Sequence, residues 1–147
     1  MPPSREETLA ERVVAEAMTW LATPYRHQAS AKGQGADCLG LVRGVYRALH
    51  GSEPETPAPY LSSPLRWDPG EPLLGAATRN LAECQSTSPG SVVLFRLRRA
   101  APVSHCGIIV STDRFIHAYR GRGVITSAWG SYWRHRLAAT FVFPETP

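Results

Sequence analysis

Hydrophobic residues recur at helical spacing near the start of the chain and predict a helix over residues 4–22. Its first residues, Ser4-Arg5-Glu6-Glu7, have the form of a capping box, in which a hydroxyl and a carboxylate bond free backbone N–H groups. Thr23-Pro24 ends the pattern, because proline disfavours helical backbone in the residue before it. The apolar positions of this helix are Leu9, Val13, Ala17, Trp20 and Leu21.

A second helical pattern begins at Cys38, directly after a residue suited to cap a helix, Asp37. His50-Gly51 supplies a C-terminal stop. Residues 25–36, between the two predicted helices, show no hydrophobic period, and we expect an irregular loop there. The apolar positions of the second helix are Leu41, Val42, Val45, Tyr46 and Leu49.

The segment after the second helix is rich in proline, and only a weak helical pattern follows it, at Leu73, Leu74, Ala77 and Leu81. We interpret residues 52–88 as an arm inserted between a helical half and a sheet half. A linker would need a separate core on each side, and two helices are too few to bury their own apolar faces.

Short β-rich runs occupy the C-terminal half and predict an antiparallel meander. Helices first and strands second indicate a single α+β domain over residues 1–147, with the second helix packed on one face of the sheet. The predicted strands are Ser91–Leu97, His105–Ser111, Arg114–Tyr119, Gly123–Ala128 and Leu137–Phe143.

Composition narrows the class of protein. The 147 residues are 43% hydrophobic and carry a formal net charge of +4. The basic residues are nearly all arginines, with Lys32 the only lysine, which indicates a general preference for arginine rather than a basic patch. This argues against a nucleic-acid partner. Arginines cluster in the C-terminal half, where they could attract acidic substrates or an acidic partner. No apolar run approaches the roughly 18 residues of a membrane span, and the first residues form no secretory h-region. We therefore expect a chain that folds in the cytoplasm without inserting into a membrane.

Three cysteines at wide spacings, Cys38, Cys84 and Cys106, argue against both a disulfide framework and a CxxC zinc site. At the first turn of a helix, free backbone N–H groups and the helix dipole stabilise negative charge, so Cys38 is placed to be a nucleophile. A buried thiol on the inner face of the helix is an equally good interpretation of the helix pattern alone.

His105 opens one predicted strand and His117 lies in the next. A three-residue loop over residues 111–113 would pair Gly107 with His117 and bring both imidazoles to one face, whereas a two-residue loop would separate them. On one face, one ring could orient the other, as a nucleophile, base and orienter triad requires. Taken singly, His117 among apolar neighbours is typical of a core histidine.

A metal hydrolase that uses His105, Cys106 and His117 is a further alternative. Neighbouring strand residues point to opposite faces, so the first two cannot easily share one ion. We therefore expect neither a metal nor another cofactor.

The order of these motifs resembles the NlpC-type family of papain-like cell-wall cysteine peptidases, whose papain-like fold is circularly permuted. The nucleophile segment is the most specific part of the resemblance, which runs from about residue 24 to residue 118. The matching stretches are Ala22-Thr23-Pro24-Tyr25-Arg26, Ala36-Asp37-Cys38-Leu39-Gly40-Leu41-Val42, Ser88-Pro89-Gly90-Ser91-Val92-Val93-Leu94-Phe95, Ser104-His105-Cys106-Gly107-Ile108 and Phe115-Ile116-His117-Ala118.

The resemblance implies that Cys38 is the nucleophile, His105 the general base and His117 the residue that orients it. Tyr25 matches a tyrosine whose hydroxyl would help to form the oxyanion hole, and Asp37, beside the nucleophile, joins it as an oxyanion or substrate residue. Family members typically hydrolyse stem peptides of peptidoglycan at the D-γ-glutamyl–diaminopimelate bond through a thioester, without a metal.

Two departures from the common pattern are Leu39 and Ser91, where many members have serine and aspartate. Residues 26–29 also lack the Gly-Gly of the commoner pattern, which affects the expected shape of the substrate cleft. The run Leu39-Gly40-Leu41-Val42-Arg43 points instead to the branch found in phage tails and gene-transfer agents. We therefore expect assembly into a phage-like particle, with tail-tip or baseplate proteins as partners, and action in the periplasm or cell wall of a target cell. A structural tail-tip subunit that keeps the fold with little or no activity is the alternative.

Overall fold

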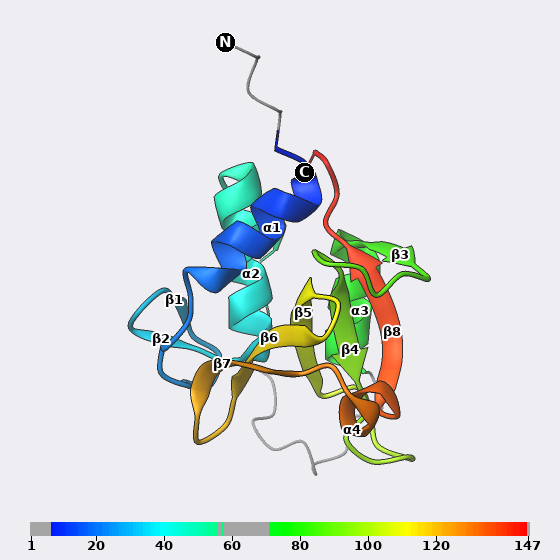
Figure 1. Ribbon diagram of the computed structural model, residues 1–147. Helices are drawn as coiled ribbons and strands as arrows, with labels where there is room; N and C mark the ends of the chain where they lie inside the picture. Colours follow the sequence, from blue (N-terminus) through cyan, green and yellow to red (C-terminus); the bar gives the residue numbers. More distant parts are fainter. Residues whose placement is uncertain (1–6, 56, 58–70, 147) are drawn as a thin grey trace.

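The computed structural model describes residues 7–55, 57 and 71–146, and helices and an antiparallel sheet form one small domain (Figure 1). Helices α1 and α2 cover one face of the large sheet, and the short α4 lies at the opposite face. The helices are α1 (Leu9–Met18), α2 (Cys38–His50), α3 (Pro72–Asn80) and α4 (Ser131–Arg134). The strands are β1 (Ser30–Ala31), β2 (Gly35–Ala36), β3 (Ala82–Cys84), β4 (Val92–Phe95), β5 (His105–Ser111), β6 (Arg114–Tyr119), β7 (Gly123–Ala128) and β8 (Leu137–Val142).

The large sheet has the order β3-β8-β4-β5-β6-β7, with antiparallel pairing throughout. The meander predicted for the C-terminal half is confirmed from β4 to β7, with the bounds of β5, β6 and β7 as expected. The last strand differs, because β8 does not follow β7 but returns to pair with β4. Strand β4 is also shorter than predicted, and β8 ends one residue earlier.

The first helix is shorter than the predicted range of residues 4–22. It begins after Thr8, whose hydroxyl accepts from the Glu11 N–H at 3.1 Å while the Glu11 carboxylate bonds the Thr8 N–H. The capping box therefore lies four residues later than expected, and the predicted cap Ser4 lies outside the described residues. Ala22 has a positive φ of 70°, and its N–H donates to the Val124 carbonyl in β7, which ends helical backbone before this point.

Helix α2 begins and ends where the sequence predicted. Asp37 caps its N-terminus, and Gly51 adopts the left-handed conformation just after the last turn. Gly44 lies under Trp20, and a Cβ atom there would stand 2.1 Å from the indole Cζ2. The glycine thus lets the Trp20 ring lie directly on the helix.

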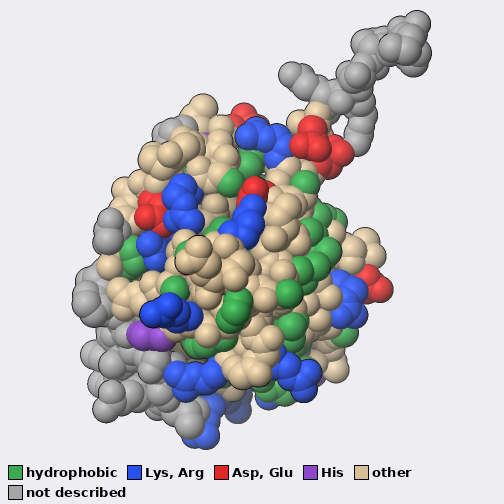
Figure 2. All heavy atoms as spheres, turned by 90° about the vertical axis from the view of Figure 1, so that its left-hand side faces the viewer, with side chains coloured by type: hydrophobic (Ala, Val, Ile, Leu, Met, Phe, Trp, Pro, Cys, Tyr) green, Lys and Arg blue, Asp and Glu red, His purple; other side chains and the backbone are tan. Residues whose placement is uncertain are grey.

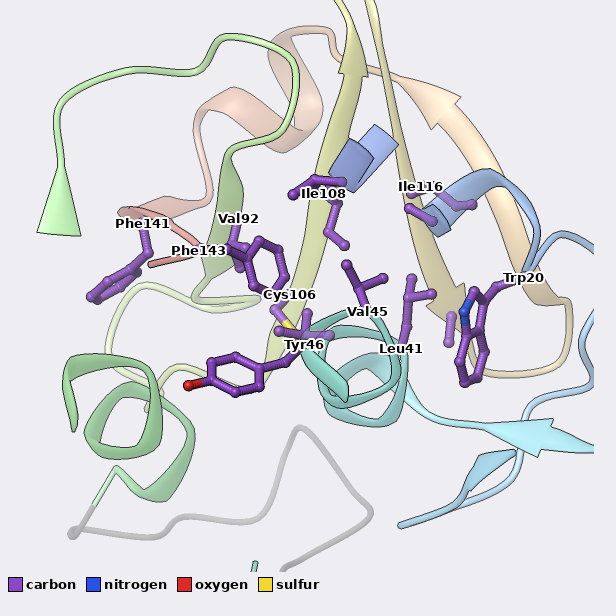
Figure 3. Packing of buried hydrophobic residues seen from close by; sticks show 14 of the residues in the cluster. Trp20, Leu41, Val45, Tyr46, Val92, Cys106, Ile108, Ile116, Phe141 and Phe143 are labelled. Carbon is purple, nitrogen blue, oxygen red and sulfur yellow. The ribbon is translucent and has the colours of Figure 1, made fainter. Parts of the chain in front are cut away.

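The main core lies between α1, α2 and one face of the sheet, as Figure 3 shows around Leu41, Val45, Ile108 and Ile116. This confirms the predicted packing of the second helix against the sheet. The opposite face carries a second, aromatic cluster, which contains Val93, Phe95, Ile109, Phe115, Trp129 and Trp133.

The loop predicted as irregular over residues 25–36 contains a small hairpin. Ser30 pairs with Ala36, and Tyr25 forms a parallel bridge with Ala36 as well. Strands of two residues carry too few positions to show a period in the sequence. The hairpin holds Tyr25 close to the start of α2.

Part of the proposed Pro-rich arm, residues 58–70, lies outside the described residues. The weak helical pattern beyond it forms α3, and β3 pairs with the edge of the sheet. Glu71 accepts from the Arg96 guanidinium at 2.7 Å and from the Val103 N–H at 2.8 Å. These bonds tie the C-terminal part of the arm to the ends of β4 and β5. Within the described ranges, no helix is long and apolar enough to span a bilayer.

Candidate active site

Cys38 is the first residue of α2 and is half-buried. Asp37 supports it, because one carboxylate oxygen accepts from the Gly40 N–H at 2.7 Å and the other from the Gln28 N–H at 2.7 Å. The Asp37 side chain is almost fully buried. The structure therefore places this predicted oxyanion or substrate residue beneath the helix start, where it fixes the position of Cys38.

Gly40 allows this arrangement to form. A Cβ atom on Gly40 would stand 1.8 Å from the carbonyl oxygen of Ala29, and the Ser30 hydroxyl donates to the Gly40 carbonyl at 2.6 Å. The first turn of α2 is thus pressed against the loop that leads into it. This close approach gives a structural reason for the glycine two residues after Cys38.

His105 and His117 lie on one face of the sheet, with Nε2 of His105 2.7 Å from Nδ1 of His117. Of the two loop lengths considered, the turn has the shorter one, because Ser111 pairs with Arg114 and leaves two residues between them. A bulge between Ile109 and Ser111 shifts the register, and beyond it Ile108 pairs with Ile116. This is the register expected for the longer loop, so the bulge brings the histidines to one face although the turn has only two residues.

Gly107 lies between the two histidines and has no room for a side chain. A Cβ atom there would stand 2.8 Å from the Ile116 carbonyl oxygen and 3.2 Å from the Cβ of His117. Any larger residue would push β6 away from β5. Glycine is thus required for the close contact of the two imidazoles.

Ser127 in β7 extends the pair of rings, with its hydroxyl 2.8 Å from Nε2 of His117. Burial of His117, with the charge of His105 as the second cause, lowers its pKa to about 3. In the neutral tautomer with its proton on Nε2, His117 donates to the Ser127 hydroxyl, and its Nδ1 accepts a hydrogen bond from the Nε2–H of His105. The three side chains form one connected hydrogen-bond chain. Sequence reasoning missed Ser127.

The Cys38 thiol is electrostatically prepared for ionisation. A hydrogen bond from the Cys106 thiol is the largest cause that lowers the pKa of Cys38, followed by a hydrogen bond and charge from His105, while burial opposes both. The same contact raises the pKa of Cys106, so Cys38 is the thiol that ionises. Since Nε2 of His105 bonds His117, Nδ1 is the ring nitrogen left for the hydrogen bond with Cys38.

Cys106 follows His105 in β5 but belongs to the opposite face of the sheet, where it lies beside α2 (Figure 3). The N-terminus of α2 meets the start of β5, so Cys38 is reached by both side chains. Among the described residues, no group of three or more histidine, cysteine or acidic side chains is placed to hold a metal ion. The face alternation and the thiol contact do not favour the metal-hydrolase alternative.

Trp133 from α4 packs over both imidazoles. Its ring centroid lies 5.5 Å from that of His105 and 5.2 Å from that of His117. Phe95 stacks against His105 at 5.9 Å and lies 4.9 Å from the Trp133 ring, on the same side of the imidazole. These aromatic rings exclude water from the histidines and restrict their rotation. No spacing in the sequence connects Trp133 with the two histidines, because α4 lies beyond β7.

Tyr25 is half-buried near Cys38. Burial raises the pKa of its hydroxyl, and the nearby charges of Cys38 and Asp37 raise it further, whereas Arg120 acts in the opposite direction. The phenol therefore stays protonated and can donate a hydrogen bond. The structure thus brings the predicted Cys38, His105, His117, Tyr25 and Asp37 into one site.

Comparison with known proteins places the chain among relatives of one family. The family model described as NlpC/P60 matches residues 22–142. A gamma-DL-glutamyl hydrolase of Bacillus subtilis (strain 168) is 31% identical over 128 residues, which cover 85% of this chain and 27% of the relative. A murein DD-endopeptidase MepS/murein LD-carboxypeptidase of Escherichia coli (strain K12) is 28% identical over 134 residues, 90% of this chain and 62% of the relative. The chain thus spans only part of these relatives.

Solved structures show the same fold. NlpC2 from Trichomonas vaginalis has a TM-score of 0.70 at 20% identity and matches 95% of this chain and 48% of its own. The NlpC/p60 domain of the peptidoglycan hydrolase SagA has a TM-score of 0.61 at 21% identity and matches 91% of this chain and 98% of its own. The match of the family model over most of the sequence shows that the chain belongs to the NlpC/P60 family.

Proposed function

We propose that this protein is a cysteine peptidase that hydrolyses stem-peptide amide bonds of peptidoglycan, at the D-γ-glutamyl–diaminopimelate linkage. The observation that carries the proposal is the connected chain from Cys38 through His105 and His117 to Ser127. The relatives named for glutamyl and murein hydrolysis support the choice of substrate.

In the proposed mechanism, the Cys38 thiolate attacks the γ-carbonyl carbon of the glutamyl residue. The backbone N–H of Cys38 and the Tyr25 hydroxyl donate to the oxyanion of the tetrahedral intermediate. Nδ1–H of His105 then protonates the amine of the diaminopimelyl residue, the C–N bond breaks and a thioester remains. His117 accepts from Nε2 of His105 and holds the ring in line with the sulfur.

The second half of the reaction uses the same groups in reverse. Nδ1 of His105 takes a proton from water, the hydroxide attacks the thioester carbonyl, and the C–S bond breaks. The products are the γ-carboxylic acid and a Cys38 thiolate beside a protonated His105. No group outside the protein is consumed except water.

The proposal is tested with a purified stem peptide and mass spectrometry of the products. Wild-type protein should release fragments cut at the γ-glutamyl linkage, and Cys38→Ala should release none. Cys84→Ala is the matched control, because that thiol lies on β3 beside Thr140 and apart from the site. Cleavage by Cys38→Ala at the wild-type rate would overturn the nucleophile assignment.

We also propose that the protein acts as a component of a phage-like tail, delivered to the cell wall of a target cell. The run from Leu39 to Arg43, which resembles the phage-tail branch of the family, supports this location. Quantitative mass spectrometry of purified particles should detect the chain together with tail proteins, and its absence from them would contradict the proposal.

A structural tail-tip subunit with the same fold would need no activated thiol. The proximity of Cys106 and His105 to Cys38 favours the enzyme over this alternative. Similar alkylation rates at all three cysteines would instead favour the structural role.

A further inference from the structure

Positive charge is concentrated in one part of the chain. Residues 96–136 contain eight of the fifteen arginines and a single acidic residue, Asp113, whereas acidic residues outnumber basic ones elsewhere. Figure 2 shows several Lys and Arg side chains and few acidic ones at the lower end of the molecule, which is also the end at which α4 lies in Figure 1. Such an uneven distribution creates a positive potential that favours anionic ligands.

Four of these arginines meet where α4 adjoins the loop after β4. The Arg96 N–H donates to the Arg136 carbonyl at 2.9 Å, so this loop begins beside the end of α4. The loop is held in place, because Leu97 packs on the aromatic cluster and the Ala101 carbonyl accepts from the Arg96 guanidinium at 3.0 Å. In Figure 1 the yellow-green loop lies just below the orange α4. The arginines that meet here are Arg98 and Arg99, both exposed in the loop, and Arg134 and Arg136, at α4.

The two arginines at α4 are held by neutral groups. The guanidinium carbon of Arg136 lies 3.6 Å from the centroid of the Tyr132 ring, and its Nη1 donates to the Tyr132 carbonyl at 2.7 Å. Arg134 lies over Trp129 at 5.0 Å, and its Nε donates to the Trp129 carbonyl at 2.9 Å. No carboxylate of the described residues lies within ion-pair distance of either guanidinium. Both therefore keep their charge, and little rotational freedom remains to be lost when an anion binds.

Tyr132 adds an apolar part to this surface. It is 55% exposed, more than any other large hydrophobic side chain of the described residues. The next residue, Trp133, is buried and packs on the imidazoles of His105 and His117. The exposed side of α4 therefore adjoins the active site through neighbouring residues of one helical turn.

The chemistry of this surface fits a polymer that carries both carboxylates and sugar rings. A guanidinium presents paired N–H groups that match the two oxygens of a carboxylate. An exposed aromatic ring offers an apolar surface on which a sugar ring can lie. Both groups occur together in peptidoglycan, whose glycan strands carry stem peptides with free carboxylates.

We propose that Arg98, Arg99, Tyr132, Arg134 and Arg136 form a second binding surface, outside the active site, for the carboxylate-bearing glycan strands of peptidoglycan. This inference rests on the proposed function. The surface holds the enzyme on the polymer while a stem peptide occupies the active site. It binds the polymer equally before and during the chemical step, so it lowers KM for the polymer without raising kcat. A short stem peptide, which cannot reach both places, gains nothing from it.

The test measures equilibrium binding of the Cys38→Ala protein to purified peptidoglycan sacculi, so that no bond is cut during the measurement. Adding Arg98→Ala and Arg99→Ala together should raise Kd about fivefold to twentyfold, equivalent to the loss of two exposed ion pairs. Arg12→Glu is the matched control, because it changes the net charge by the same amount on α1, which covers the other face of the sheet. Salt screens so distant a charge, and Kd should change by about twofold or less.

Two further ligands show which chemistry the surface recognises. On sacculi whose free carboxylates have been amidated, Arg98→Ala with Arg99→Ala should change Kd by about twofold or less, because the charge partners are gone. An equal loss of binding on untreated and amidated sacculi would overturn the carboxylate assignment. Tighter binding of polyglutamate than of sacculi, with the same loss in the double variant, would identify an acidic protein as the partner and overturn the assignment to the cell wall.

Binding and cleavage can fail separately. Weaker binding of sacculi by the double variant, but not by Arg12→Glu, supports the surface even if the wild type cleaves no stem peptide. In an active enzyme, the double variant should raise KM for sacculi and so lower the ratio of kcat/KM for sacculi to kcat/KM for a short stem peptide. An unchanged ratio together with an unchanged Kd for sacculi would refute the surface and leave the proposed activity intact.

Discussion

Replacement of Ser127 by alanine tests whether the hydrogen-bond chain behind the nucleophile is directed. The Ser127 hydroxyl lies 2.8 Å from Nε2 of His117, whose other nitrogen lies 2.7 Å from His105. The buried ring has two neutral tautomers, and only the one with the proton on Nε2 can accept from His105. Ser127→Ala removes the group that favours this tautomer.

The size of the expected fall in kcat/KM follows from the single hydrogen bond that Ser127→Ala removes. A neutral hydrogen bond contributes about 1 kcal/mol net, which corresponds to roughly a fivefold change in an equilibrium or a rate. The backbone of β7 and the aromatic cover from Trp133 do not depend on the hydroxyl. We therefore expect kcat/KM to fall about fivefold in Ser127→Ala, and the free energy of unfolding to fall by about 1 kcal/mol, since the buried imidazole loses its partner.

The assay is stem-peptide hydrolysis, with Ser127→Thr as the control because it keeps the hydroxyl. Nitrogen-15 NMR of the histidine rings reports the tautomer of His117 directly and should show the proton on Nε2 in the wild type. The reasoning is refuted if Ser127→Ala retains wild-type kcat/KM, or if the wild-type proton lies on Nδ1.

Three further changes test separate parts of the structure. Cys106→Ala should raise the pKa of Cys38 by about one unit, since a hydrogen bond to a charged group contributes about 1.5 kcal/mol. Cys106→Ser keeps a hydrogen-bond donor and is the control. The pH dependence of Cys38 alkylation measures this pKa, and an unchanged value in Cys106→Ala would contradict the role of Cys106. The pKa of His117, about 3 in the folded protein against 6.5 as its ordinary value, means that the unfolded state binds more protons between these pH values. His117 therefore contributes fully to the free energy of unfolding above pH 6.5. As the pH falls from 6.5 towards 3, this free energy decreases by up to about 1.4 kcal/mol per pH unit. Urea unfolding at pH 7 and pH 5 should show that His117→Asn loses less free energy of unfolding between these pH values than the wild type does. Equal losses would show that His117 does not cause this pH dependence. Gly44→Ala should destabilise the fold by about 1–3 kcal/mol in urea unfolding, because its Cβ atom would overlap the Trp20 ring, and wild-type stability would show that the ring moves freely.

The parts of the fold that the sequence predicts well depend on local signals. Helix α2 is specified by Asp37 at its start and Gly51 at its end, so Cys38 could be placed at a helix N-terminus without a structure. Strands β5, β6 and β7 are likewise specified by short apolar runs between turns. Local signals mislead where two of them compete, as Ser4 and Thr8 each begin a sequence of the capping-box form.

The parts that could not be predicted depend on register and on contacts between distant segments. The bulge before Ser111 sets which residues of β5 and β6 face each other, and the turn sequence alone favours no such shift. Ser127 meets His117 only because β7 pairs with β6, and Trp133 reaches both histidines from beyond that strand. The contact of Cys106 with Cys38 depends in the same way on where α2 meets β5.

The activation of Cys38 is tested most directly by the rates at which the three thiols react with iodoacetamide at pH 7, followed by peptide mass spectrometry. Hydrogen bonds from Cys106 and His105 lower the pKa of Cys38, and the pKa of Cys106 is raised. Cys38 should therefore be alkylated much faster than Cys84 or Cys106, and His105→Ala should remove much of this advantage. Equal rates at Cys38 and Cys84 would show that the Cys38 thiol is not activated.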